Sequence, residues 1–213
     1  MIDDYCERIG PELWAEPINA LTNLAFFISA WVIWQLAFRL HKLSPGIWIL
    51  IILIVTIGIG SSLFHTFATT WAYWLDIVPI LLFQFVYLWQ YAYRIIKLNS
   101  KSTSGLLVLY SVATYVGRQF PQILNGSLMY APAFLLLIGL GSYHYLYKKK
   151  ERSILLFSLG VLILSLSLRT VDNTICPYFP IGTHFFWHLF TALLTYMVAR
   201  VLLINLVTKK KTA

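Results

Sequence analysis

Long uncharged, apolar stretches separated by short charged segments dominate the pattern of this chain. No Asp, Glu, Lys or Arg occurs in 17–38, 43–75, 119–147 or 173–199. A helix needs about 20 mostly apolar residues to cross a bilayer, and each of these stretches is long enough to hold one. The pattern predicts an all-α integral membrane protein, a seven-transmembrane helix bundle with spans at 17–39, 47–68, 73–96, 103–120, 127–147, 153–171 and 181–206.

Composition supports the membrane assignment. Hydrophobic residues make up 59% of the chain and charged residues only 11%, against about 25% charged in ordinary soluble domains. A water-soluble fold of this length has too little interior to hide so much apolar surface. Residues 1–213 are predicted to form a single domain, with 1–16 as a non-cytoplasmic N-terminal cap and 207–213 as a cytoplasmic basic tail.

The distribution of Lys and Arg predicts the orientation. With seven spans, one side of the membrane holds nearly all the basic residues, and the other holds only Arg8, Arg118 and Arg169. Basic loops stay cytoplasmic, so the C-terminus is predicted to be cytoplasmic and the N-terminus outside or lumenal. Because the basic residues are spread over juxtamembrane loops, they indicate contact with anionic membrane lipids, and we expect no nucleic-acid partner. No feature sets an oligomeric state.

Two cysteines fall on the non-cytoplasmic side of this topology. Cys6 lies in the N-terminal segment and Cys176 lies between the sixth and seventh spans. Disulfides persist in that compartment, so we predict a Cys6–Cys176 disulfide. The alternative is a pair of buried thiols.

Three histidines fall at similar depth in the non-cytoplasmic half of the bilayer. His184 and His188 are four residues apart and share one face of a helix, and His65 ends the second span with Ser61 on its face. Asp76 follows the next loop at the same depth. Three imidazoles favour zinc with an open fourth position, although iron, copper and nickel also accept imidazole. A proton relay, an ion pathway or a hydrogen-bond network between helices stays open.

The other two histidines are predicted to have no ligand role. His41 and His144 lie at cytoplasmic span ends beside basic residues. Such positions are typical of interfacial, solvated side chains.

Several blocks of the chain resemble the alkaline ceramidase family, a branch of the CREST superfamily of seven-span membrane hydrolases and receptors. The resemblance covers nearly the whole chain, and its Ser-x₃-His, His-x₁₀-Asp and His-x₃-His spacings are specific. The blocks are Asp4-Tyr5-Cys6-Glu7 with Trp14-Ala15-Glu16-Pro17-Ile18-Asn19 and Thr22-Asn23, then Gly60-Ser61 with Phe64-His65, then Asp76-Ile77-Val78-Pro79, and finally His184 with Trp187-His188.

The resemblance implies an intramembrane zinc-dependent amidohydrolase that acts on linear amides. Its substrate would be ceramide or a related N-acyl lipid, which would enter from the bilayer. The enzyme would cleave this lipid to a fatty acid and a long-chain amine, with zinc-bound water as the nucleophile. His65, His184 and His188 match the zinc ligands of the family, and Ser61 and Asp76 match its catalytic serine and aspartate. A zinc-containing receptor of the same superfamily, without turnover, is the alternative.

Alternatives remain for single residues. Ser61 is also compatible with a hydrogen bond to its own helix backbone, and Asp76 with an N-cap. The family carries a calcium site on its N-terminal acidic segment, which Asp4, Glu7 and Glu16 match. Ile9 stands where the family pattern has an asparagine ligand, so a solvated acidic segment is the alternative to calcium.

Overall fold

The computed structural model describes residues 1–206 and is built from helices, with no β-strand in that part of the chain. The predicted basic tail, 207–213, lies outside the described residues. The elements run α1 (Pro17–Thr22), α2 (Leu24–Arg39), α3 (Pro45–Phe67), α4 (Thr70–Gln90), the π-helical η1 (Tyr91–Ile96), α5 (Ser100–Arg118), the 3₁₀-helical η2 (Ile123–Tyr130), α6 (Ala131–Leu146), α7 (Ile154–Ile175) and α8 (His184–Asn205).

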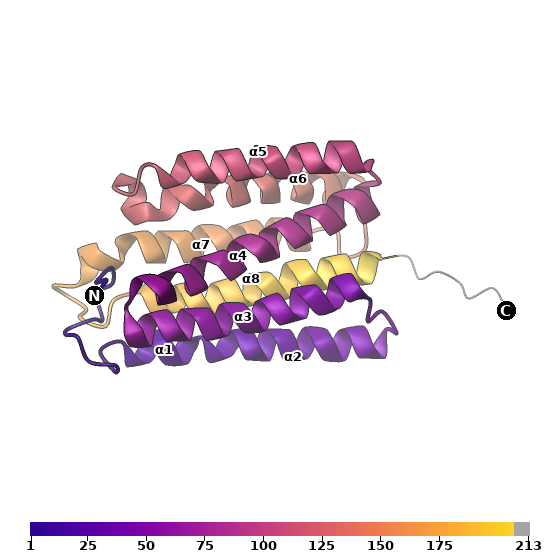
Figure 1. Cartoon of the computed structure of the whole chain (residues 1–213). Coiled ribbons are helices and arrows are strands. Elements are labelled where there is room, and N and C mark those ends of the chain that lie inside the picture. Colours follow the sequence, from indigo (N-terminus) through magenta and orange to yellow (C-terminus); the bar gives the residue numbers. More distant parts are fainter. Residues whose placement is uncertain (207–213) are drawn as a thin grey trace.

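The long helices run side by side in one bundle (Figure 1). In it α3 packs on α4, α8 packs on both α2 and α7, and α5 lies with α6 along one side. The N-terminal segment, the end of α3 and the start of α8 lie together at one end, which we call the N-terminal end. The ends of α6 and α8 lie at the opposite end, so the N-terminal segment and the end of α8 are separated by the length of the bundle.

Six helical segments are long and apolar enough to cross a membrane: Pro17–Arg39, Pro45–Phe67, Thr70–Ile96, Ile123–Leu146, Ile154–Ile175 and His184–Asn205. The remaining predicted span, 103–120, corresponds to α5, a helix of 19 residues. It begins with a run of Ser, Lys and Thr side chains, which makes it less apolar than the others. The fold is therefore an all-α membrane bundle with six long apolar helices and α5 beside them.

The surface and the core of the bundle are both apolar. Ile33, Leu50 and Leu202, from α2, α3 and α8, are fully buried in one central cluster. On the outside, Leu109 of α5 and Phe157 of α7 are 65% and 67% exposed. Large apolar side chains on the surface are costly in water, and lipid is the solvent that suits them.

Gly60 lets α3 and α4 approach each other closely. A Cβ atom at this position would collide with the backbone oxygen of Leu75 and crowd the amide of Asp76. Contact at this point brings Asp76 of α4 beside Ser61 of α3. A glycine in the middle of a helix lowers helix propensity. Here it permits the close contact between α3 and α4 that places Ser61 and Asp76 together.

Asp172 ties three segments together at the N-terminal end. Its buried carboxylate accepts backbone N–H groups from Cys6, Thr183 and His184, at 2.6–2.9 Å. The last two amides open α8, so the carboxylate also stabilises the start of that helix. Gly182 has φ +70° and its missing side chain leaves room for Asp172. This arrangement sets the position of His184.

Candidate metal centre and hydrolytic site

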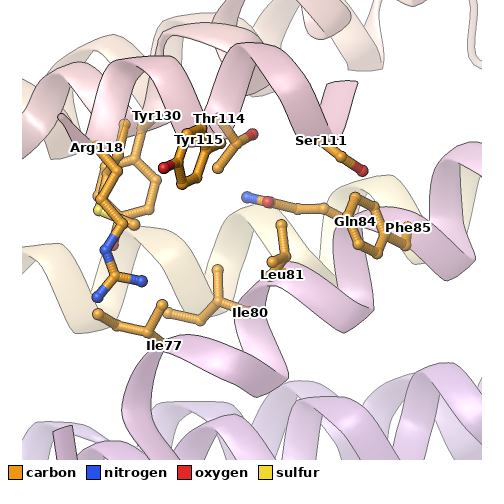
Figure 2. Close-up of a pocket in the computed structure, with 11 residues that line it drawn as sticks. Ile77, Ile80, Leu81, Gln84, Phe85, Ser111, Thr114, Tyr115, Arg118 and Tyr130 are labelled. Carbon is orange, nitrogen blue, oxygen red and sulfur yellow. The ribbon is translucent and has the colours of Figure 1, made fainter. Parts of the chain in front are cut away.

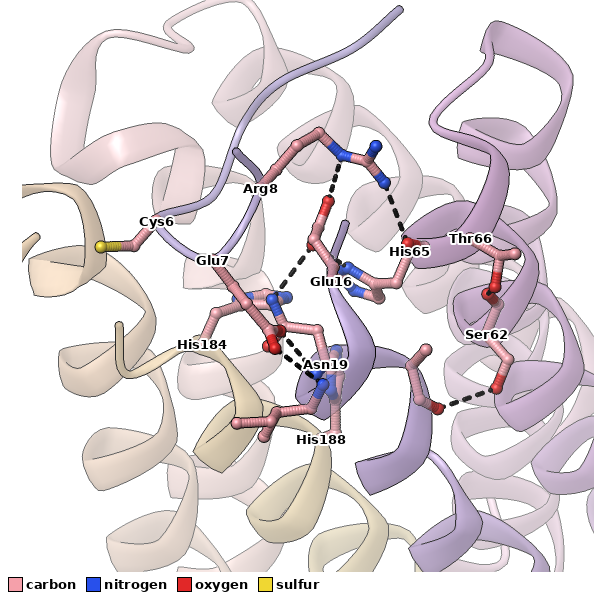
Figure 3. Close-up of polar contacts among 12 residues, drawn as sticks. Cys6, Glu7, Arg8, Glu16, Asn19, Ser62, His65, Thr66, His184 and His188 are labelled. Atoms are coloured by element: carbon pink, nitrogen blue, oxygen red, sulfur yellow. Dashed lines mark hydrogen bonds and ion pairs between the residues drawn. The ribbon is translucent and has the colours of Figure 1, made fainter. Parts of the chain in front are cut away.

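Three buried histidines converge at the N-terminal end of the bundle. His65 comes from the last turn of α3, and His184 and His188 come from the first two turns of α8. One nitrogen from each ring lies within 4.8 Å of the others. The exposed fractions are 0%, 2% and 1%, so these rings meet in a dry interior. Figure 3 shows them around the N-terminal segment.

Within residues 1–206, each ring keeps one buried nitrogen without a hydrogen-bond partner: Nε2 of His65, Nδ1 of His184 and Nε2 of His188. A buried polar atom left unpaired costs free energy. Three such atoms in one cluster are the mark of a site that takes a ligand. This finding disfavours the alternative of a hydrogen-bond network between helices, because the unpaired atoms are the ones such a network would use.

The hydrogen-bond partners of the Nδ1 atoms of His65 and His188 indicate the tautomer of each ring. Nδ1 of His65 contacts the Glu16 carboxylate at 2.5 Å, and a carboxylate only accepts, so Nδ1 carries the proton. Nδ1 of His188 lies 2.9 Å from the Thr22 hydroxyl, which donates to the Ile18 or Asn19 carbonyl. Thr22 therefore accepts from His188. In both rings Nε2 is left with its lone pair free to bind a metal.

Tyr5 and Asp172 hold the third ring. The Tyr5 ring stacks on His184 with centroids 3.5 Å apart and planes 15° apart. The backbone amide of His184 donates to Asp172 at 2.8 Å. Ring stacking and the fixed helix start restrict the imidazole without occupying its buried Nδ1.

Ser61 and Asp76 lie together beside this cluster. Ser61 lies one helical turn before His65 and is 3% exposed, and its side chain lies next to the Asp76 carboxyl group. Among the described residues Ser61 makes no hydrogen bond to its own helix backbone, unlike Thr66, which bonds to the Ser62 carbonyl. The N-cap interpretation of Asp76 is wrong, since α4 already begins at Thr70.

A comparison with protein families decides where this chain belongs. A family model described as Ceramidase matches residues 3–213. The chain belongs to the ceramidase family. A search of curated proteins finds no match. The family membership supports a ceramidase-type hydrolase, and the three-histidine cluster of this ceramidase-family chain is compatible with a metal site.

The predicted calcium residues are engaged with protein groups in this ceramidase-family chain. Glu7 accepts the backbone amides of Ile18 and Asn19 at 2.7 and 2.8 Å, at the start of α1. Glu16 binds Arg8 and His65, each at 2.5 Å. The exposed Asp4 lines a separate cavity. Calcium binding gains no support from these contacts and stays a prediction.

Arg8 takes the place next to Glu16 that a bound cation would need. Its side chain is buried and donates to Glu16, to the Gly10 carbonyl and to the His65 carbonyl. Burial by itself would raise the pKa of Glu16, but hydrogen bonds from His65, Asn19 and Arg8 hold the pKa below its usual value. Glu16 is therefore a carboxylate that orients His65.

Sequence reasoning missed several parts of this site. The pattern along the chain does not predict the buried ion pair of Arg8 or the amide contacts of Asp172. Nor does it predict the contacts of Tyr5 and Thr22 with the histidine rings. Arg8 is the one basic residue among the acidic residues before Pro17, which is a signal for a buried ion pair. The disulfide between Cys6 and Cys176, by contrast, is one that the sequence predicts, and the structure contains it with Cα atoms 5.4 Å apart.

His144, at the opposite end, differs from its prediction. It is fully buried rather than solvated. Its Nδ1 meets the Tyr91 hydroxyl at 2.7 Å and its Nε2 meets the Lys150 carbonyl at 2.9 Å. The basic residues nearby suggested an exposed interface, but the turn that follows α6 folds back over the ring.

Proposed function

We propose that this ceramidase-family protein is a zinc-dependent amidohydrolase that cleaves the amide of ceramide or a related N-acyl lipid. The observation that carries the proposal is the convergence of three buried imidazoles, which bring one nitrogen each to within 4.8 Å of the others and each keep an unpaired nitrogen. Three imidazoles are a donor set that fits zinc, and His65, His184 and His188 would hold the ion. Zinc held there supplies a Lewis acid that activates water near neutral pH.

The residues around the cluster have distinct tasks. Glu16 and Thr22 hold His65 and His188 in the tautomer that presents Nε2. Asp76 takes a proton from the attacking water and delivers it to the leaving amine. Ser61, beside Asp76, donates a hydrogen bond to the oxygen that gains negative charge, a contribution of about 2.7–4 kcal/mol where such donors have been removed.

A lateral groove supports entry of the lipid from the bilayer. It has a volume of about 160 Å³ and lies between α4 and α5. Figure 2 shows Ile77, Ile80 and Leu81 along its α4 wall and Tyr115 on α5. Apolar walls suit acyl chains, and Tyr130 and Arg118 lie at its polar end.

The proposal includes the topology predicted from the sequence. Counting α5 (Ser100–Arg118) as a span gives seven spans in all, which places the two chain termini on opposite sides of the membrane. The basic loops then lie in the cytoplasm and the metal centre lies in the non-cytoplasmic half of the bilayer.

The test combines metal content with amide hydrolysis. Wild type and His188→Ala are purified in detergent, zinc is quantified by elemental analysis, and both are incubated with a short-chain fluorescent ceramide. We expect about one zinc per chain and fatty-acid release from wild type only. Zinc without turnover of any N-acyl lipid would favour the receptor alternative. Absence of zinc from metal-supplemented wild type would overturn the proposal.

A further inference from the structure

A polar cavity adjoins the metal centre. Its volume is about 420 Å³, and the N-terminal segment, α4, α5, η2 and α7 form its walls. Tyr5, which stacks on His184, and Asp76, the proposed proton carrier, both line it. If the proposed function holds, the polar part of the substrate occupies this cavity while its amide reacts.

Arg118 enters the cavity from the end of α5. Its guanidinium carbon lies 4.4 Å from the centre of the Trp74 ring and 5.9 Å from that of Tyr73. Within residues 1–206 it has no hydrogen-bond acceptor and no carboxylate within 4.0 Å, since the three ion pairs there involve other residues. In Figure 2 its head points into the space between α4 and α5.

Arg169 enters the same cavity from α7. It donates through Nη1 to the Asn125 carbonyl and the Ser127 hydroxyl, both at 2.8 Å. The rings of Tyr5, Tyr130 and Trp187 surround it at 5.6–5.9 Å. Again, no carboxylate lies within 4.0 Å of it in the described part of the chain.

Two guanidinium groups without carboxylate partners therefore face one cavity at the edge of an apolar bundle. A cation removed from bulk water is costly unless an anion or other acceptors compensate for the loss. Guanidinium groups match carboxylates and phosphates in geometry, and aromatic faces hold them in place. We propose that this cavity selects N-acyl lipids whose polar part carries an acidic group, which Arg118 and Arg169 bind.

Acidic residues of the cavity define where that group sits. Asp76 belongs to the hydrolytic site and lies beside Ser61, so the amide and not the acidic group approaches it. Asp3 and Asp4 are exposed on the N-terminal segment, where water reaches them. The acidic group is therefore held on the side formed by α5 and α7.

The lateral groove shares Ile77, Arg118, Met129 and Tyr130 with this cavity. Arg118 thus lies where an apolar groove meets a polar space. A lipid with its chain between α4 and α5 places its polar part next to this guanidinium. The same junction explains why Arg118 tests the proposal better than Arg169, which also holds η2 in place.

The test measures binding rather than turnover. The metal-loaded protein in neutral detergent is titrated with an N-acyl amino acid and with its methyl ester, with Trp fluorescence as the readout. Ceramide 1-phosphate and ceramide form a second pair, so the two arms distinguish a carboxylate from a phosphate. We expect the acidic member of at least one pair to bind about tenfold more tightly than the neutral member.

Variants assign the preference. Arg118→Gln should reduce the preference to less than about twofold. Arg118→Lys should restore only part of it, because a lysine keeps the charge but lacks the forked N–H donors and the stacking on Trp74. Arg152→Gln is the matched control, because this substitution changes the net charge equally at the opposite end of the bundle. There the guanidinium carbon of Arg152 lies 4.9 Å from the centre of the Tyr145 ring. This variant should keep the full preference.

Three results would overturn the proposal. They are equal binding within both pairs, a preference that survives Arg118→Gln, and displacement of the acidic ligand by an equal amount of phosphatidylglycerol. The second would point to the metal as the anion site, and the third to an unselective lipid contact. Failure of the proposed function would appear separately, as absence of hydrolysis with the binding preference intact.

Discussion

Both ends of the helix bundle bury histidine side chains, but the two ends differ in whether the ring nitrogens have hydrogen-bond partners. At the opposite end, His144 has both ring nitrogens paired, with Tyr91 and with the Lys150 carbonyl. At the N-terminal end, His65, His184 and His188 each keep one buried nitrogen unpaired. Burial alone therefore does not distinguish a ligand from a structural histidine. The unpaired atoms make the distinction, because a fold leaves them unpaired at a cost unless something binds there.

The carboxylates of the two ends are both paired, but they differ in burial. Glu16 is buried between Arg8 and His65, whereas Glu151 pairs with Arg200 at the partly exposed opposite end. The first carboxylate orients a ring of the proposed metal centre, and the second joins two segments at the surface. Substitutions at matched positions of the two ends should therefore affect different properties.

The largest effect is expected from Asp76→Asn. The substitution keeps the shape of the side chain but removes its ability to carry a proton, so ceramide hydrolysis should fall by about 10²–10⁴-fold. Zinc content should stay at the wild-type level, since Asp76 is not among the three converging ligands. Loss of zinc together with activity would show that Asp76 belongs to the metal centre instead.

The next largest effect should come from Glu16→Gln. An amide orients His65 less strongly than a carboxylate, so zinc affinity, measured by competition with a chelator, should fall about 10–100-fold. The matched substitution at the opposite end, Glu151→Gln, should leave zinc affinity unchanged. If both variants lose zinc to the same extent, the contrast between the ends is wrong.

His144→Ala should reduce stability and leave the metal in place. The substitution leaves the Tyr91 hydroxyl and the Lys150 carbonyl without their partner, which costs about 1–3 kcal/mol of unfolding free energy. Thermal unfolding in detergent measures the loss, and zinc content per chain serves as the control. A drop in zinc would mean that the two ends are coupled.

The smallest effect is expected from Glu151→Gln on stability, about 0.2–1 kcal/mol, because the pair is partly exposed. A hydrogen bond from Arg200 is the main cause that holds the pKa of Glu151 below its usual value. Such a carboxylate stabilises the fold above its unfolded pKa and loses this contribution as pH falls through the lowered value. The difference in melting temperature between wild type and variant should therefore shrink on acidification.

The sequence predicts several residues of the site, but it does not predict the contacts between them. His65, His184, His188 and Ser61 were identified from spacing, since a helical period of 3.6 residues fixes which side chains share a face. The contact between Ser61 and Asp76 depends on the approach of α3 to α4 at Gly60. No periodicity within either helix encodes that approach.

The amino-acid sequence by itself determined the all-α membrane fold, the positions of most long helices and the candidate metal ligands. These follow from local physics: runs of apolar residues need lipid, and backbone groups in lipid must pair within a helix. Only the tertiary structure decided that Arg8 neutralises Glu16, that Asp172 holds the start of α8, and that His144 is buried and paired. Those contacts join residues from different structural elements, and their energy depends on burial, which a linear pattern does not specify.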